Sequence, residues 1–156
     1  MAANLDTTDI NILKTLQDNC RLTVKELAAA IHLSTTPTFD RMKRLEKEGF
    51  IKKYIAVLDA EKLNCGFIAF CYIKLKQHTY ENSIRIMEAV KGIDEIAECY
   101  NISGDYDFML KIYVEDMKSY QNFLLRILGD LDCIGSLSSS FVLGEVKNVH
   151  AIPIRK

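Results

Sequence analysis

The spacing of apolar residues changes near residue 67, and this change limits what the chain can fold into. Before it, apolar residues recur every three or four positions, which is the period of a helix that buries one side. After it, β-rich stretches are interleaved with two amphipathic segments. With 156 residues, the chain is close to one domain of ordinary size or two small ones. We therefore expect a helical domain followed by an α+β domain.

Three short helices are predicted before the change, each with a recognisable start. Asp6 is a candidate N-cap for the first helix, and Thr23 and Glu26 have the spacing of a capping box for the second. The third helix is expected to begin at Ser34 and to end at Gly49, which suits a left-handed backbone position. The apolar residues expected on its buried side are Phe39, Met42 and Leu45.

The second and third helices are separated by only a few residues, as in a helix-turn-helix. The segment 49–59 that follows is rich in β-forming residues and predicts a short wing or hairpin. The alternative interpretation of the third helix is a solvated face with charge pairs. Together these features favour a winged helix-turn-helix.

The third helix and the wing have an excess of basic residues over acidic ones. Residues 41–53 hold six basic and two acidic residues, whereas the whole chain has a formal net charge of −1. Small hydroxyl residues at the start of the helix can approach base edges and phosphates. We therefore expect double-stranded DNA as a partner. The candidate contact residues are Ser34, Thr35, Thr36, Thr38, Arg41, Lys43, Arg44, Lys47, Lys52 and Lys53.

The second half predicts the order strand, helix, strand, strand, helix, strand. The expected ranges are 67–75, 79–92, 93–102, 106–115, 117–129 and 134–144, with a two-residue turn at Gly104-Asp105 between the middle strands. This is the βαββαβ order of a ferredoxin-like α/β sandwich. The expected division is a helical domain at 1–53, a linker strand or hinge at 54–66, and an α/β domain at 67–156.

Both faces of the predicted sheet carry apolar residues. In the strand 106–115, alternate residues from Tyr106 to Val114 fall on one face, which we expect to lie under the helices. The opposite face includes Met109 and Tyr113, and the first strand adds Ile68, Phe70 and Tyr72 to it. Since helices on one side normally leave the other face polar, self-association is expected to cover this face.

Features of several other protein classes are missing from the sequence. There is no basic start followed by an apolar run and no stretch near roughly 18 apolar residues, so we expect a cytoplasmic protein without a membrane partner. The five cysteines form no C-x-x-C pair and the three histidines lie far apart, so no metal site is expected. Asp105 and Asp107 could form an acid/base pair, but Asp beside glycine is common in turns. We expect no catalytic residues and no bound cofactor.

The chain resembles the Lrp/AsnC (feast/famine) transcriptional regulators over essentially its whole length. In the first half the resemblance is carried by Asp9, Ile12-Leu13, Arg21, Glu26-Leu27-Ala28, Leu33-Ser34, Arg41, Arg44-Leu45-Glu46, Gly49 and Ile51. The second half, with Gly104-Asp105-Tyr106-Asp107, resembles that family's regulatory domain. Phe39 departs from the family pattern, in which a smaller aliphatic residue is common, and this bears on how the third helix sits.

The resemblance implies an amino-acid-responsive regulator that forms homodimers, commonly assembled to octamers, with the amino acid bound between neighbouring dimers. A free amino acid needs N–H donors for its carboxylate and an anionic or carbonyl acceptor for its ammonium group. Backbone N–H groups around Gly104 could serve the first need, and the Asp105 carboxylate the second. The candidate effector-binding residues are Tyr100, Asn101, Gly104, Asp105, Tyr106, Ser136, Ser138, Ser139 and Ser140.

A different class of function is also compatible with the second half. A metabolite-binding or small enzymatic α/β sandwich could carry an unrelated helical appendage. That alternative gives no reason for the excess of basic over acidic residues within 41–53. We therefore expect a DNA-binding transcriptional regulator of amino-acid metabolism and not an enzyme.

Overall fold

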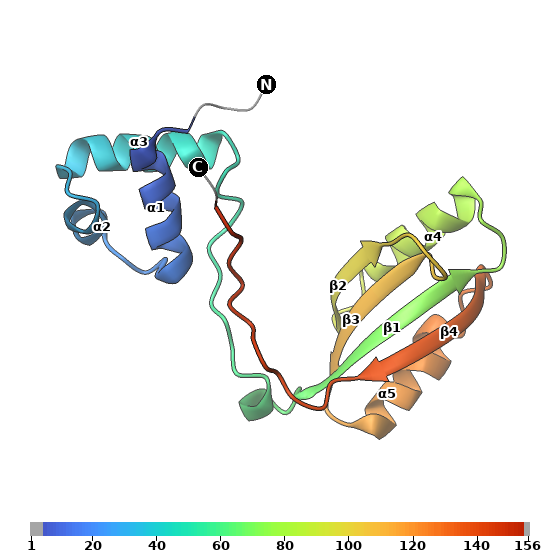
Figure 1. Ribbon diagram of the computed structural model, residues 1–156. Coiled ribbons are helices and arrows are strands. Elements are labelled where there is room, and N and C mark those ends of the chain that lie inside the picture. Colours follow the sequence, from blue (N-terminus) through green and yellow to red (C-terminus); the bar gives the residue numbers. More distant parts are fainter. Residues whose placement is uncertain (1–4, 155–156) are drawn as a thin grey trace. The chain divides into compact units, whose positions relative to one another are not determined.

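The computed structural model describes residues 5–154, and the chain divides into two compact units (Figure 1). The first unit runs up to Val57 and also includes the tail that begins at Lys147, and the second unit runs from Leu58 to Val146. The tail therefore belongs to a different compact unit from the rest of the predicted domain 67–156. The ends of the predicted domains, 1–4 and 155–156, lie outside the described residues.

The tail is held in the first unit by the side-chain amide of Gln17. The backbone N–H of Ile152 donates to Gln17 Oε1 at 2.8 Å, and Gln17 Nε2 donates to the Ile152 carbonyl at 3.3 Å. One side-chain amide thus satisfies both backbone groups of a residue that has no strand partner of its own. Nothing in the sequence pattern around Ile152 predicted this contact.

Three helices form the core of the first unit: α1 (Thr7–Asp18), α2 (Val24–Ala30) and α3 (Thr35–Lys47). Asp6 caps α1, and Thr23 and Glu26 form the predicted capping box at α2. Ser34 is the N-cap of α3, and Gly49 has a φ of +79° just after it, as expected. The predicted starts of all three helices are therefore confirmed.

The buried side of α3 differs from the prediction. Leu45 is fully buried, but Phe39 is 43% exposed, and the second fully buried position is Thr38. Thr38 and Leu45 are seven residues apart and therefore lie on one side of the helix, whereas Phe39 is turned about 100° away from Thr38. The prediction placed Phe39 in the core because it is hydrophobic. Its position on the helix relative to the buried Leu45 instead puts it outside the core.

The segment after α3 is extended but forms no hairpin among the described residues. Every residue from Lys52 to Asp59 is exposed, and none of them belongs to a strand in the described part of the chain. A short 3-10 turn, η1 (Glu61–Leu63), replaces the end of the predicted linker strand, and Asn64 closes it with a left-handed backbone. The wing of this helix-turn-helix is thus a single extended segment.

The second unit has the predicted βαββαβ order. Its elements are β1 (Phe67–Leu75), α4 (Tyr80–Val90), β2 (Ile96–Asn101), β3 (Phe108–Val114), α5 (Met117–Phe123), a π-helical turn η2 (Leu124–Leu128) and β4 (Ile134–Phe141). The four strands form one antiparallel sheet in the order β2-β3-β1-β4. The ferredoxin-like topology is therefore confirmed.

The connection between β2 and β3 is longer than the two-residue turn that was predicted. Asn101 pairs with Phe108, so six residues, 102–107, form the connection. Asp107 precedes β3, and its backbone N–H donates to the Ile73 carbonyl of β1 at 2.8 Å. The longer loop leaves room for a hollow at this end of the sheet.

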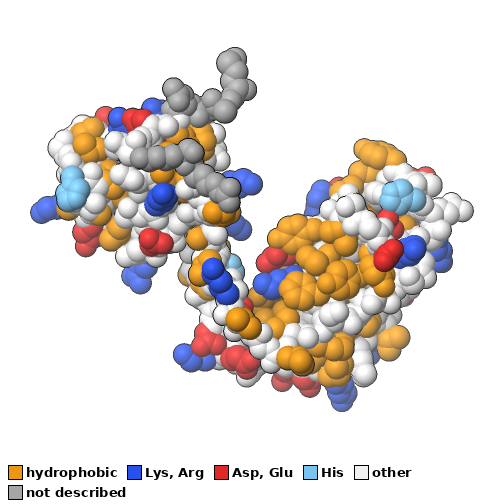
Figure 2. Space-filling model, viewed as in Figure 1, with side chains coloured by type: hydrophobic (Ala, Val, Ile, Leu, Met, Phe, Trp, Pro, Cys, Tyr) orange, Lys and Arg blue, Asp and Glu red, His pale blue; other side chains and the backbone are white. Residues whose placement is uncertain are grey.

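The helices α4 and α5 cover one face of the sheet, as Figure 1 shows. The residues of β1 and β3 that face them are buried at alternate positions, which confirms the predicted inner face. On the opposite, open face, Figure 2 shows hydrophobic side chains gathered over the strands. This apolar patch consists of Ile68, Phe70, Tyr72, Met109 and Tyr113, all half-buried in the single chain.

Candidate functional site

Helix α3 presents an outer face of polar and basic side chains. Thr35 and Thr36 are exposed in its first turn, and the Ser34 side chain makes no capping hydrogen bond. Lys47, Lys52 and Lys53 are exposed and have no ion-pair partner within residues 5–154. These side chains remain available to an anionic ligand.

The two arginines of α3 are engaged inside the first unit instead. Arg41 Nη1 lies 2.6 Å from Asp6 Oδ2 and 2.8 Å from Asp9 Oδ1, and Arg44 Nη2 lies 2.6 Å from Asp9 Oδ2. The Asp9 side chain is only 1% exposed. These ion pairs join α3 to the start of α1, so Arg41 and Arg44 hold the position of the helix.

The same contacts shift the pKa values of the partners. The Asp9 backbone N–H, followed by the Arg41 guanidinium, lowers the pKa of Asp6 below its usual value. In return, hydrogen bonds to Asp6 and Asp9 raise the pKa of Arg41. Both groups are therefore held in their charged forms at the junction of the two helices.

Two further predicted DNA contacts have partners within the chain. Thr38 is completely buried and its Oγ1 donates to the Ser34 carbonyl at 2.9 Å, so its expected contact with DNA is wrong. Lys43 Nζ lies 2.7 Å from Glu46 Oε2, but the Lys43 side chain is 54% exposed. Such an exposed pair contributes little to stability, and Lys43 can exchange Glu46 for another anion at little cost.

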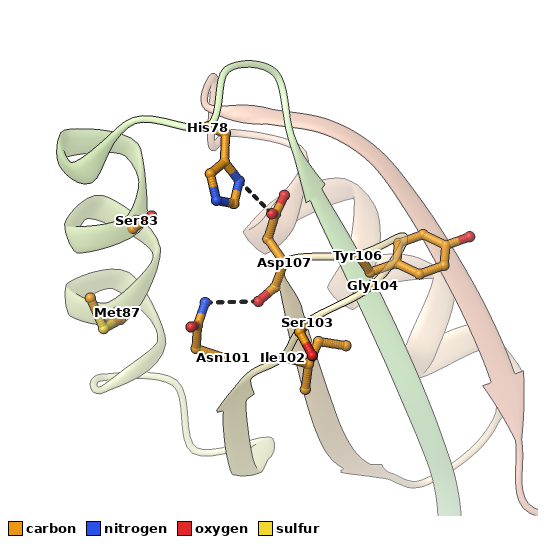
Figure 3. Close-up of a pocket in the computed structure, with 9 residues that line it drawn as sticks. All are labelled: His78, Ser83, Met87, Asn101, Ile102, Ser103, Gly104, Tyr106 and Asp107. Atoms are coloured by element: carbon orange, nitrogen blue, oxygen red, sulfur yellow. Dashed lines mark hydrogen bonds and ion pairs between the residues drawn. The ribbon is translucent and has the colours of Figure 1, made fainter.

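A hollow of about 460 Å³ lies at the end of the sheet where the β2–β3 connection meets α4 (Figure 3). Its volume is in the range of small-molecule sites. The residues that line it are His78, Ser83, Met87, Asn101, Ile102, Ser103, Gly104, Tyr106 and Asp107. The lining mixes a carboxylate, an amide and hydroxyls with apolar groups, which suits a small polar molecule with an apolar side chain.

Asp107 organises the wall of the hollow. Its Oδ2 accepts from the Leu75 backbone N–H at 2.7 Å, and its Oδ1 lies 2.7 Å from His78 Nδ1. Its carbonyl accepts from Asn101 Nδ2 and from the Ile102 N–H, both at 2.9 Å. Because both carboxylate oxygens are engaged, Asp107 supports the loop and does not form an acid/base pair with the exposed Asp105.

The loop beside the hollow carries uncommitted hydrogen-bond donors. Within residues 5–154, the backbone N–H groups of Ser103, Gly104, Asp105 and Tyr106 donate to no other backbone carbonyl or side chain. Gly104 has a φ of +123°, a conformation that favours glycine. This run of N–H groups is suited to an anionic oxygen.

The effector residues predicted from the sequence separate into two groups. Asn101, Gly104 and Tyr106 line the hollow, although the Tyr106 ring points away from the others in Figure 3 and lies 5.5 Å from the Tyr72 ring. Asp105 is exposed outside the lining. Tyr100 lies on the open face of the sheet, where its hydroxyl donates to Glu98 Oε2 and that carboxylate raises the pKa of Tyr100.

The four predicted serines do not reach the hollow of their own chain. Ser136, Ser138 and Ser140 lie on the open face, opposite Lys74, Tyr72 and Phe70 of β1. Ser139 points to the helical side, where its Oγ is 2.6 Å from the Tyr120 hydroxyl. Ser139 is therefore engaged in the core of its own unit.

The lining includes residues that were not among the predicted effector contacts. They are His78, Ser83, Met87, Ile102, Ser103 and Asp107. Ser83 and Met87 are four positions apart on a predicted amphipathic helix, so they could have been found by asking which face meets the loop. His78 carried no such signal, because its place depends on the path of the chain after β1.

No group of three His, Cys, Asp or Glu side chains is placed to hold a metal ion within residues 5–154. No helix in that range is long and apolar enough to cross a membrane.

Comparisons with known proteins match both units. The Lrp/AsnC ligand binding domain matches residues 68–152, and the winged helix-turn-helix DNA-binding family matches residues 5–52. The DNA-binding transcriptional activator DecR of Escherichia coli (strain K12) is 35% identical over 150 residues, which cover 96% of this chain and 99% of DecR. The leucine-responsive regulatory protein of the same organism is 35% identical over 152 residues, covering 97% of this chain and 93% of the relative.

A solved structure is similar over nearly its whole length. It is a transcriptional regulator of Neisseria meningitidis in complex with L-methionine, and it has a TM-score of 0.92 and 33% sequence identity. The match covers 96% of this chain and 97% of that chain.

We expect Asp107→Ala to destabilise the second unit by about 1–3 kcal/mol, because it leaves the Leu75 N–H without its acceptor. The matched change Asp105→Ala should alter stability by no more than about 0.5 kcal/mol. Urea unfolding followed by tyrosine fluorescence measures this, since six of the seven tyrosines lie in the second unit. Equal effects of the two changes would contradict the role given to Asp107.

Proposed function

Since the chain belongs to the Lrp/AsnC family of transcriptional regulators, we propose that it binds specific DNA sequences and regulates amino-acid metabolism in the cytoplasm in response to a free amino acid. The observation that carries the effector half of this proposal is the hollow beside the free N–H groups of residues 103–106. The proposal of DNA binding is supported by the exposed threonines and lysines on the outer face of α3.

Helix α3 acts as the recognition helix. Its arginines fix it against α1 through Asp9, so the outer side chains are presented on a rigid element. Thr35 and Thr36 reach base edges and phosphates, and Lys43 and Lys47 neutralise phosphates. Lys52 and Lys53 extend the basic surface into the wing.

The hollow of the second unit takes the effector. The carboxylate of an amino acid binds the N–H groups around Gly104, and its ammonium group faces the carboxylates of Asp105 and Asp107. The apolar part of the ligand contacts Met87 and Ile102. The relative solved with L-methionine and the leucine-responsive relative support an amino acid as the class of ligand.

The apolar patch of the open sheet face is covered by a second copy of the chain. A two-layer unit of this size gains stability by burying such a face, and a closed dimer does so symmetrically. Tyr100 and the serines Ser136, Ser138 and Ser140 lie on this face and would then meet the partner. Dimers assemble further, to octamers, and a neighbouring subunit closes the exposed side of the hollow.

DNA binding is tested with the full-length protein, its own upstream promoter duplex and a shuffled duplex. We expect tighter binding to the promoter than to the shuffled duplex. The affinity should also fall as salt rises, because protein binding releases condensed cations from the DNA and this release is less favourable at high salt. Lys47→Ala should reduce the slope of log affinity against log salt by about one. Arg44→Ala is the matched comparison and should lower the thermal stability of the first unit instead. Equal affinity for both duplexes, without salt dependence, would overturn the proposal.

Self-association through the sheet is tested with Phe70→Lys. A charge at the centre of the apolar patch should convert the protein to monomers in sedimentation velocity, because an unpaired buried cation costs several kcal/mol. Leu125→Lys is the control, since Leu125 is 75% exposed on the helical side of the same unit. Monomers from both variants, or from neither, would contradict the proposed interface.

A further inference from the structure

We propose that Phe39 determines operator specificity, its ring contacting the C5 methyl group of a thymine in the major groove. This inference rests on the proposed DNA-binding function and names a base feature that the protein reads. Its starting point is the exposure of Phe39, which is 43% accessible although phenylalanine is normally buried.

The fold gives Phe39 no role in the core of the first unit. That core contains Ile12, Leu16, Leu27 and Leu45, and the inner side of α3 at this level is filled by the buried Thr38. The Phe39 ring instead contacts Lys43, whose Nζ lies 5.8 Å from the ring centroid. The ring is thus held on the outer face by a residue one helical turn later.

The neighbours of Phe39 favour a base edge as its partner. Thr36 and Lys43 are three and four positions away, so they share the outer face with it. Asp40 is also exposed on this face, and its carboxylate would repel phosphates. This turn of the helix is therefore suited to face the bases and not the DNA backbone. Thymine presents the one apolar group in the major groove, its methyl, and apolar side chains contact it there.

Lys43 has a separate part in this arrangement. Its ammonium group is near both the Phe39 ring and the Glu46 carboxylate, which lies 2.7 Å away. On DNA it exchanges Glu46 for a phosphate beside the thymine. Phe39 therefore supplies base selectivity, and Lys43 supplies affinity that does not depend on sequence.

The test replaces thymine with deoxyuridine, which lacks only the methyl group. The full-length protein first selects a duplex from a random-sequence pool, and each thymine of the selected duplex is then replaced in turn. Fluorescence anisotropy should show one position per half-site at which deoxyuridine weakens binding roughly fourfold, the effect of one buried methyl group. Phe39→Ala should bind thymine and deoxyuridine equally at that position, and Phe39→Leu should keep part of the difference.

Phe50→Ala is the matched control, because Phe50 is similarly exposed but follows α3. It should keep the full penalty for deoxyuridine, and circular dichroism should show unchanged helix content for Phe39→Ala. A selected duplex with no methyl-sensitive position, or a penalty that persists in Phe39→Ala, overturns the inference and leaves DNA binding intact. A pool that yields no selected sequence overturns the DNA-binding proposal and this inference with it.

Discussion

The end of the sheet that carries the hollow depends on the contacts of the Asp107 carboxylate. This carboxylate accepts the last free N–H of β1 at Leu75, and it holds His78 on the path toward α4. Its backbone meanwhile bonds to β1 and to the end of β2. One residue therefore joins three strands and the chain leading to the helix. Between these anchors, the backbone N–H groups of residues 103–106 have no acceptor within residues 5–154 and lie beside the hollow.

Asp9 has a comparable position in the first unit. Its buried carboxylate takes one arginine from each of two successive turns of α3, so the helix is fixed by charge as well as by Leu45. A buried carboxylate without these partners would be costly. The positive residues of α3 thus divide by their side of the helix. Arg41 and Arg44 pair with the carboxylates at the start of α1, while Lys43 and Lys47 are exposed.

Patterns that depend on neighbours in the sequence predicted the fold well. The caps at Asp6 and Thr23 are local hydrogen bonds, and the alternation in β3 follows from the pleat of a strand, so both could be read from spacing. The site was predicted less completely because its parts meet only in three dimensions. Asp107 read as the start of a strand, and only the register with β1 shows that its side chain turns to Leu75. Phe39 was placed in the core by hydrophobicity, although the phase of its helix puts it outside.

We propose that the hollow takes a free amino acid, and a thermal-shift screen of the full-length protein against the common amino acids tests this most directly. A ligand that binds the folded protein at 100 times its dissociation constant stabilises it by about 2.7 kcal/mol. We expect at least one apolar amino acid to raise the melting temperature. Ser83→Phe, which fills the hollow, should abolish this rise, while Tyr80→Ser, on the same helix outside the lining, should preserve it. No rise with any amino acid, or an undiminished rise in Ser83→Phe, would contradict the claim.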